Sequence, residues 1–133
     1  MFKSIIDKIK SFQTGIKNIL RWFPIIWKDR NYDHAFIEYM LLHKLQMMYD
    51  RFNDPNETYV NWGTIHAKKA LKALRICITI LQRRKNEFYI FHLWNEKEDD
   101  LTDEVMIRID MTERRDWKLL HKLMEQYMEY WWD

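Results

Sequence analysis

Residues 68–85 read KKALKALRICITILQRRK, and this stretch decides the fold. Its apolar positions recur at steps of three and four residues, at Leu71, Leu74, Ile78 and Leu81. Its polar positions keep the same rhythm on another side, at Lys68, Lys72, Arg75, Thr79 and Gln82. That spacing predicts an amphipathic helix with one buried face. The cations that close it suit a helix C-terminus, where the macrodipole is negative.

The rest of the chain favours more helices. With 2 Gly and 2 Pro in 133 residues, it has few of the turn residues that an all-β protein needs. We expect four helices. Three of them cover about residues 3–21, 33–52 and 112–131. The remaining one, third in the chain, begins somewhere between residues 58 and 64 and ends at about residue 85. Residues 86–94 are either another helix or a continuation of the third after a kink. The sequence thus predicts an all-α, single-domain bundle of four to five helices spanning residues 1–133.

Several residues mark the expected helix ends. Pro24 disfavours helix at Phe23, since a residue before proline avoids helical backbone angles. Asp33 or Asn31 is placed to N-cap the second helix, and Thr112 to N-cap the last one. Residues 105–109 precede this last cap, and we expect them to be helical or irregular.

The second helix is apolar over more than one stripe, which an ordinary surface helix is not. We therefore expect it either to be the central helix or to face a second subunit. The surplus of aromatic residues adds to the expectation of a homo-oligomer. Phe36, Met47 and Met48 are the candidate interface residues.

The first segment, residues 1–21, is a basic amphipathic helix at one end of the domain. Its apolar residues are Phe2, Ile5, Ile9, Phe12, Ile16 and Ile19, and its lysines fall elsewhere on the helical wheel. The plainest interpretation is a helix packed on the core. A helix lying on a lipid surface and a partner-binding helix are the alternatives.

Charge is distributed unevenly around a net value of +2. Residues 61–85 hold seven Lys or Arg and no Asp or Glu, whereas residues 86–133 hold six and thirteen. Such a chain can pair its own halves or present separate basic and acidic faces. A strong binder of duplex DNA normally has a larger basic excess, which argues against duplex nucleic acid as the partner.

Cysteine content and hydropathy exclude other classes. The single cysteine, Cys77, cannot form an internal disulfide or a multi-thiolate zinc site, and its apolar surroundings predict a buried side chain. The first ten residues do not have the pattern of a signal peptide, so we expect none, and no stretch has the ~20 apolar residues of a membrane span. We expect a cytoplasmic protein with no membrane partner.

The sequence contains no recognisable set of catalytic or metal-binding residues, which favours a protein without enzymatic activity. Two glycines cannot build a phosphate-binding loop. His34 and Glu38 are four residues apart, but the rest of a ligand set is not visible, so a surface pair is expected. The acidic residues 96–104 lack calcium-loop spacing and are expected to be a solvated loop. Asp29 and Asp33 have the chemistry of an acid–base pair but no visible nucleophile. We expect no metal and no cofactor.

Aromatic and basic residues occur side by side, as in Trp27-Lys28, and the chain holds 7 Trp, 7 Tyr and 7 Phe. Aromatic faces stack on nucleobases and cations neutralise phosphate, although protein interfaces favour the same residues. The acid-free run 68–75 is the best candidate for an anion-facing surface, with a solvated helix face as the alternative. The candidate ligand-binding residues are Lys68, Lys72, Arg75, Arg30 and Trp27.

The run Trp27-Lys28-Asp29-Arg30-Asn31-Tyr32-Asp33, the helix after it and the ending Trp131-Trp132-Asp133 resemble small helical accessory proteins of tailed bacteriophages. The resemblance covers about residues 22–52 and the last three residues. It implies a phage accessory protein expressed in the host bacterial cytoplasm, and small phage proteins of this general kind include inhibitors of host defence. On this basis we expect an oligomer that sequesters a phosphorylated ligand, most plausibly a cyclic nucleotide immune signal, without cleaving it. The alternatives are a module that blocks a host protein and a weak nucleic-acid binder.

Overall fold

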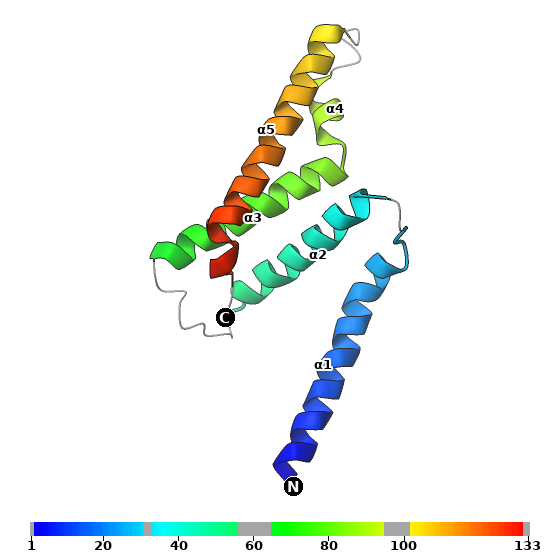
Figure 1. Ribbon diagram of the computed structural model, residues 1–133, viewed down its shortest axis with the longest axis vertical. Helices are drawn as coiled ribbons and strands as arrows, with labels where there is room; N and C mark the ends of the chain where they lie inside the picture. Colours follow the sequence, from blue (N-terminus) through cyan, green and yellow to red (C-terminus); the bar gives the residue numbers. More distant parts are fainter. Residues whose placement is uncertain (1, 31–32, 56–64, 95–101, 132–133) are drawn as a thin grey trace. The chain divides into compact units, whose positions relative to one another are not determined.

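The structure is a computed structural model that describes residues 2–30, 33–55, 65–94 and 102–131 (Figure 1). These residues form α1 (Phe2–Ile26), α2 (Ala35–Phe52), α3 (Ile65–Lys85), α4 (Phe88–Leu93), α5 (Asp103–Tyr127) and the 3₁₀ turn η1 (Met128–Tyr130). The described residues contain no strand, which confirms the predicted all-α bundle of four to five helices. Not one of these helices combines the length and the apolar character needed to cross a membrane.

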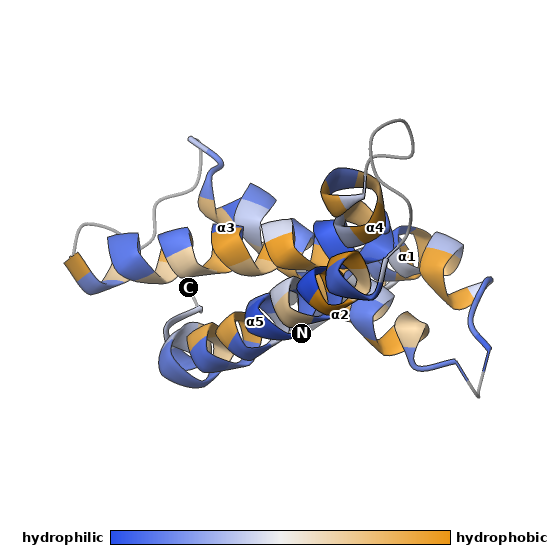
Figure 2. Ribbon diagram, turned by 90° about the horizontal axis from the view of Figure 1, so that it is seen from above, coloured by the Kyte–Doolittle hydropathy of each residue, from blue (hydrophilic) through white to orange (hydrophobic). Residues whose placement is uncertain are grey.

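The chain divides into two compact units, residues 1–40 and residues 41–133. The first unit contains α1 and the beginning of α2. The second contains the rest of α2 together with α3, α4, α5 and η1. Figure 2 shows hydrophobic and hydrophilic residues alternating along α3 and α5, as is usual for helices with one buried face.

The core of the second unit is built on α3. Eight of its residues are buried: Ala67, Ala70, Ala73, Leu74, Cys77, Ile78, Ile80 and Leu81. By contrast, α2 buries only Leu42 and Leu45. The expectation that the second helix is central was therefore wrong. Three of the buried α3 residues, Ala67, Ala70 and Ala73, are alanines, and such small side chains allow close packing of neighbouring elements.

The end of the described chain is fixed to the same helix. Trp131 is buried, and its Nε1 donates a hydrogen bond of 2.8 Å to the carbonyl oxygen of Ala70. Leu120 of α5 lies in the same core cluster. The aromatic ending of the sequence thus includes a side chain that closes the core.

Residues 86–94 contain a separate short helix rather than a continuation of α3. Glu87 between α3 and α4 has a φ of 53°, in the left-handed region. That one residue turns the chain so that Tyr89 is buried with Val105 and Ile109 of α5. In Figure 1, α4 lies beside the beginning of α5.

The last helix begins earlier than predicted. It starts at Asp103, where the Thr102 hydroxyl oxygen accepts a hydrogen bond from the Val105 N–H. Thr112, the predicted N-cap, lies inside the helix, and its hydroxyl donates to the Arg108 carbonyl. The reason is that Val105 and Ile109 bury one side of an earlier helical segment, so packing extends the helix.

The two other predicted boundaries had different outcomes. The Asp33 carboxylate accepts a hydrogen bond of 2.9 Å from the Ala35 N–H at the start of α2, which confirms its capping role. Pro24 does not end α1, which continues to Ile26. A proline N–H is missing from the hydrogen-bond ladder, but Leu20, whose carbonyl loses its partner, is exposed and open to hydration. The predicted cap Asn31, the start of the third helix between 58 and 64, and most of the acidic loop lie outside the described residues.

Candidate anion-binding site

A cleft lies between α3 and α5, within the second unit. Its volume is about 320 Å³. Its lining residues come from both helices: Lys72, Arg75, Ile76, Thr79, Ile80, Arg83, Asp116 and Leu119. The six α3 members recur at steps of one, three and four residues, so one helix brings them to one side. The cleft therefore combines an aliphatic surface with three cationic side chains.

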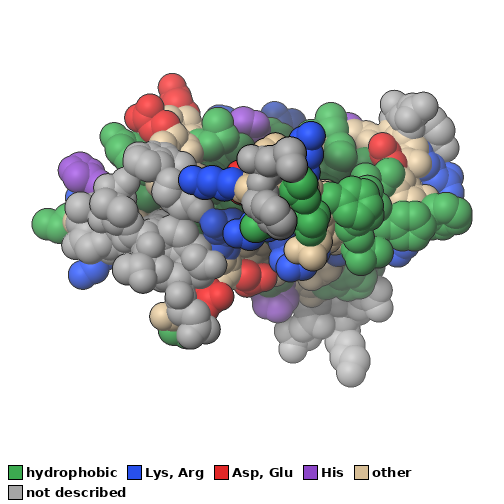
Figure 3. Space-filling model, turned by 90° about the horizontal axis from the view of Figure 1, so that it is seen from below, with side chains coloured by type: hydrophobic (Ala, Val, Ile, Leu, Met, Phe, Trp, Pro, Cys, Tyr) green, Lys and Arg blue, Asp and Glu red, His purple; other side chains and the backbone are tan. Residues whose placement is uncertain are grey.

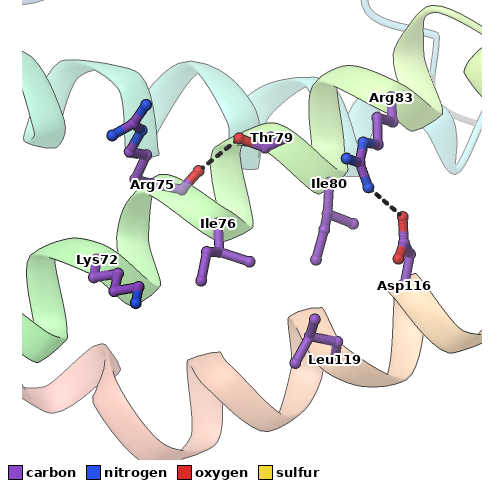
Figure 4. A pocket seen from close by; sticks show the side chains of 8 residues that line it. All are labelled: Lys72, Arg75, Ile76, Thr79, Ile80, Arg83, Asp116 and Leu119. Atoms are coloured by element: carbon purple, nitrogen blue, oxygen red, sulfur yellow. Dashed lines mark hydrogen bonds and ion pairs between the residues drawn. The ribbon is translucent and has the colours of Figure 1, made fainter.

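The aliphatic part of the cleft forms its interior. Ile76, Ile80 and Leu119 point into the space between α3 and α5 (Figure 4). Ile80 is almost completely buried, whereas Leu119 is partly exposed. The cleft thus offers a dry wall to the apolar part of a ligand.

Arg83 is held at one end of the cleft. Its Nη1 lies 3.2 Å from Asp116 Oδ2, and its guanidinium carbon lies 5.0 Å from the centre of the Phe88 ring. The Asp116 carboxylate is buried and also accepts a hydrogen bond of 2.7 Å from the Tyr89 hydroxyl. Burial, reinforced by this hydrogen bond and the negative charge of Asp116, raises the pKa of Tyr89, so the phenol stays a donor. Arg83 is therefore oriented before any ligand arrives.

Arg84 is used differently from its neighbour. Its Nη1 lies 2.8 Å from Glu113 Oε1, and its guanidinium carbon lies 4.3 Å from the centre of the Trp117 ring. It is not among the residues that line the cleft. Of the two adjacent arginines, Arg83 faces the cleft and Arg84 ties α3 to α5.

Lys72 and Arg75 are the cations at the other end of the cleft, and both side chains are exposed. In Figure 4 the Arg75 guanidinium points away from Leu119, while its carbonyl oxygen accepts a hydrogen bond of 3.0 Å from the Thr79 hydroxyl. Arg75 thus contributes its stem to the lining and holds its charge at the rim. Long side chains of this kind can turn toward a bound anion.

Two of the five predicted ligand-binding residues, Lys72 and Arg75, meet in this cleft. Lys68 lies one turn earlier on α3, exposed and outside the lining. Trp27 and Arg30 belong to the other unit, residues 1–40. Trp27 is 76% exposed, and the centre of its ring lies 5.3 Å from the centre of the Phe23 ring.

Sequence reasoning missed Arg83 and Asp116. Arg83 was interpreted as one of the cations that close the helix, and Asp116 was not among the candidate residues. A signal was available for Asp116, because it falls at helical spacing between Ile109 and Leu120, which are both buried. A carboxylate on a buried stripe requires a partner of opposite charge or a hydrogen-bond donor.

Two other residues with reactive side chains, Asp33 and Cys77, have structural roles in the described part of the chain. Asp33 caps α2. Cys77 is fully buried, as predicted, and burial raises the pKa of its thiol to about 11. Among the described residues, no group of three His, Cys, Asp or Glu side chains is arranged to hold a metal ion.

Comparison of the chain with protein-family models, with curated proteins and with solved structures finds no match.

Proposed function

We propose that this protein binds a small phosphorylated ligand in the cleft between α3 and α5 and does not convert it. The observation that carries the proposal is that Lys72, Arg75 and Arg83 all line one aliphatic cleft, with the Arg75 charge at its rim. Cations beside a dry wall attract an anion more strongly than the same cations in open water. An arginine fork that is already oriented spends little side-chain entropy when it meets phosphate oxygens.

The volume of the cleft sets the size of the ligand. Small-molecule sites usually measure about 300–1,000 Å³, and this cleft, at about 320 Å³, is at the lower limit. It suits a phosphate group with a compact organic part against Ile76, Ile80 and Leu119. A long polymer would contact the rim only.

The absence of catalysis in this proposal follows from the state of Asp116. Its carboxylate is the acidic group of the cleft lining, and Oδ2 already accepts hydrogen bonds from Arg83 and Tyr89. A general base needs a lone pair directed at the proton that it removes. Asp116 instead serves to position Arg83.

The narrower form of the proposal is a phage accessory protein that sequesters a cyclic nucleotide immune signal in the bacterial cytoplasm. Its support is the sequence resemblance together with the cationic cleft. A nucleobase prefers an aromatic stacking surface, whereas the cleft is lined by aliphatic side chains. In this form of the proposal a second copy in a homo-oligomer supplies the aromatic ring.

The test is titration calorimetry with pyrophosphate, mononucleotides and cyclic di- and trinucleotides, followed by mass spectrometry of the recovered ligand. Lys72→Glu/Arg75→Glu should weaken binding at least about tenfold, because two attractive charges become repulsive. The matched control is Lys44→Glu/Lys118→Glu, which makes the same charge change at exposed positions outside the lining. It should keep most of the affinity.

Three outcomes contradict the proposal. Equal affinity of the cleft variant and wild type would place the ligand elsewhere. Equal losses in the cleft variant and its control would reduce the effect to net charge. A recovered ligand of changed mass would show that the protein is an enzyme.

A further inference from the structure

The exposed side of α1 is an apolar feature that the cleft does not explain. Seven apolar side chains between residues 5 and 20 are 42–71% exposed: Ile5, Ile6, Ile9, Phe12, Ile16, Ile19 and Leu20. At 100° per residue they share one side of the helix, which we name the α1 apolar face. Contiguous apolar surface of this kind marks an interaction site.

Cations border this face. Lys3, Lys10 and Lys17 are spaced by seven residues, which returns nearly to the same side of a helix, with a drift of about 20° per seven residues. Arg21 and Lys28 extend this row, and Lys8 lies at the opposite border. The side opposite the apolar face carries Asp7, Ser11 and Asn18 instead. The apolar face thus has cations along its edges.

The cations along the edges of the α1 apolar face indicate which kind of partner can bind to it. An antiparallel second copy on the same face would bring the two rows of cations together, and they would repel each other. An anionic lipid surface attracts them, and lysine stems can reach the headgroups while the apolar side chains enter the acyl boundary. Trp22, Phe23 and Trp27 at the end of α1 are residue types enriched at membrane interfaces.

We propose that the α1 apolar face binds the surface of an anionic phospholipid bilayer, with α1 lying in the plane of the interface. A helix of 25 residues is about 37 Å long and presents this face along most of its length. The sequence-based expectation of no membrane partner rested on the lack of a spanning segment, which a helix that lies on the surface does not need. Figure 3 views the molecule from below the orientation of Figure 1 and shows hydrophobic side chains exposed next to Lys and Arg side chains.

The experiment is co-sedimentation of the full chain with two kinds of vesicle, phosphatidylcholine alone and phosphatidylcholine mixed with phosphatidylglycerol. Wild type should bind the mixed vesicles and not the neutral ones, and added salt should weaken binding. Lys3→Gln/Lys10→Gln/Lys17→Gln should lose about 100-fold in affinity, since each lysine near an anionic surface contributes about fivefold.

A matched pair of variants separates the apolar face from charge. Ile9→Gln/Ile16→Gln removes two exposed side chains from the face, whereas Ser11→Gln/Asn18→Gln changes the opposite side, and neither alters the net charge. The first should lose at least about tenfold in affinity and the second should bind like wild type. Because all four positions are exposed, both should show wild-type circular dichroism and urea unfolding.

Four results would overturn the proposal. The first two are equal binding by the two variants and equal binding to neutral and anionic vesicles. The third is no binding to either kind of vesicle, and it would leave the face to a protein partner. The fourth is a dimer that forms without lipid and that Ile9→Gln/Ile16→Gln dissociates, as seen by analytical ultracentrifugation, and it would assign the face to a second copy.

Discussion

The Tyr89 hydroxyl donates a hydrogen bond to Asp116 Oδ2 across 2.7 Å, and both residues are buried. The same oxygen lies 3.2 Å from Arg83 Nη1. Three helices meet at this oxygen, because Arg83 belongs to α3, Tyr89 to α4 and Asp116 to α5. The junction that positions an arginine of the cleft therefore also connects α4 to the rest of the unit.

Tyr89→Phe keeps the ring and removes this hydrogen bond. In this variant Arg83 remains as a partner of Asp116, but the buried carboxylate has lost the Tyr89 donor. This loss should lower the free energy of unfolding by about 2 kcal/mol. Urea denaturation would measure the change. Tyr130→Phe is the control, since Tyr130 is 44% exposed and should lose less than about 0.5 kcal/mol. Equal stability of Tyr89→Phe and wild type would contradict the role given to this bond.

Cys77→Ala should alter the pH dependence of stability. Burial raises the pKa of the Cys77 thiol from 9.0 to about 11, so the folded protein holds this proton more tightly than the unfolded chain. The stability that this difference contributes is complete below pH 9.0 and is lost as the pH rises to about 11. Between those limits the free energy of unfolding of wild type should fall by about 2 kcal/mol more than that of Cys77→Ala.

Urea unfolding of both proteins at pH 8 and pH 11 would measure this difference. The cost of removing the sulfur atom is the same at both pH values, so it cancels in the comparison. Parallel losses in the two proteins would show that the thiol does not titrate in this range.

The sequence was sufficient to predict the fold class and most of the helices, because helical spacing is local. Leu74, Ile78 and Leu81 lie on the stripe predicted for residues 68–85 and are buried. The predicted helix boundaries were wrong where tertiary packing determines the end of the helix. Thr112 satisfies the rules for an N-cap, yet the burial of Val105 and Ile109 carries α5 through it.

The candidate site was half predictable for a related reason. Lys72 and Arg75 stand out in an acid-free run, and charge density can be read from a linear sequence. Arg83 and Asp116 are 33 residues apart and meet only because α3 packs on α5.

Met48, predicted as a subunit contact, packs against the core cluster. A charged residue at 48 would therefore destabilise the unit itself, and exposed Ile37 is the better position for a test of assembly.

Trp131→Phe tests the closure of the core by the end of the chain. The variant keeps an aromatic ring but loses the hydrogen bond to the Ala70 carbonyl and part of the buried volume. We expect a loss of about 2 kcal/mol in the free energy of unfolding, measured by urea denaturation. Trp27→Phe is the matched control, because Trp27 is 76% exposed. Similar losses in the two variants would show that Trp131 does not fasten η1 to α3.

Glu87→Gly should stabilise the protein. Glu87 has a φ of 53° and a ψ of 31°, which a residue with a Cβ adopts at a cost and glycine adopts freely. Relief of that cost, offset in part by the greater freedom of glycine in the unfolded chain, should add about 1 kcal/mol to the free energy of unfolding. Glu87→Ala separates backbone from charge, because it removes the carboxylate and keeps the Cβ. Thermal and urea unfolding should show a gain for glycine that clearly exceeds the gain for alanine. If alanine gained as much, the effect would come from the carboxylate near the negative end of the α3 macrodipole and not from the turn.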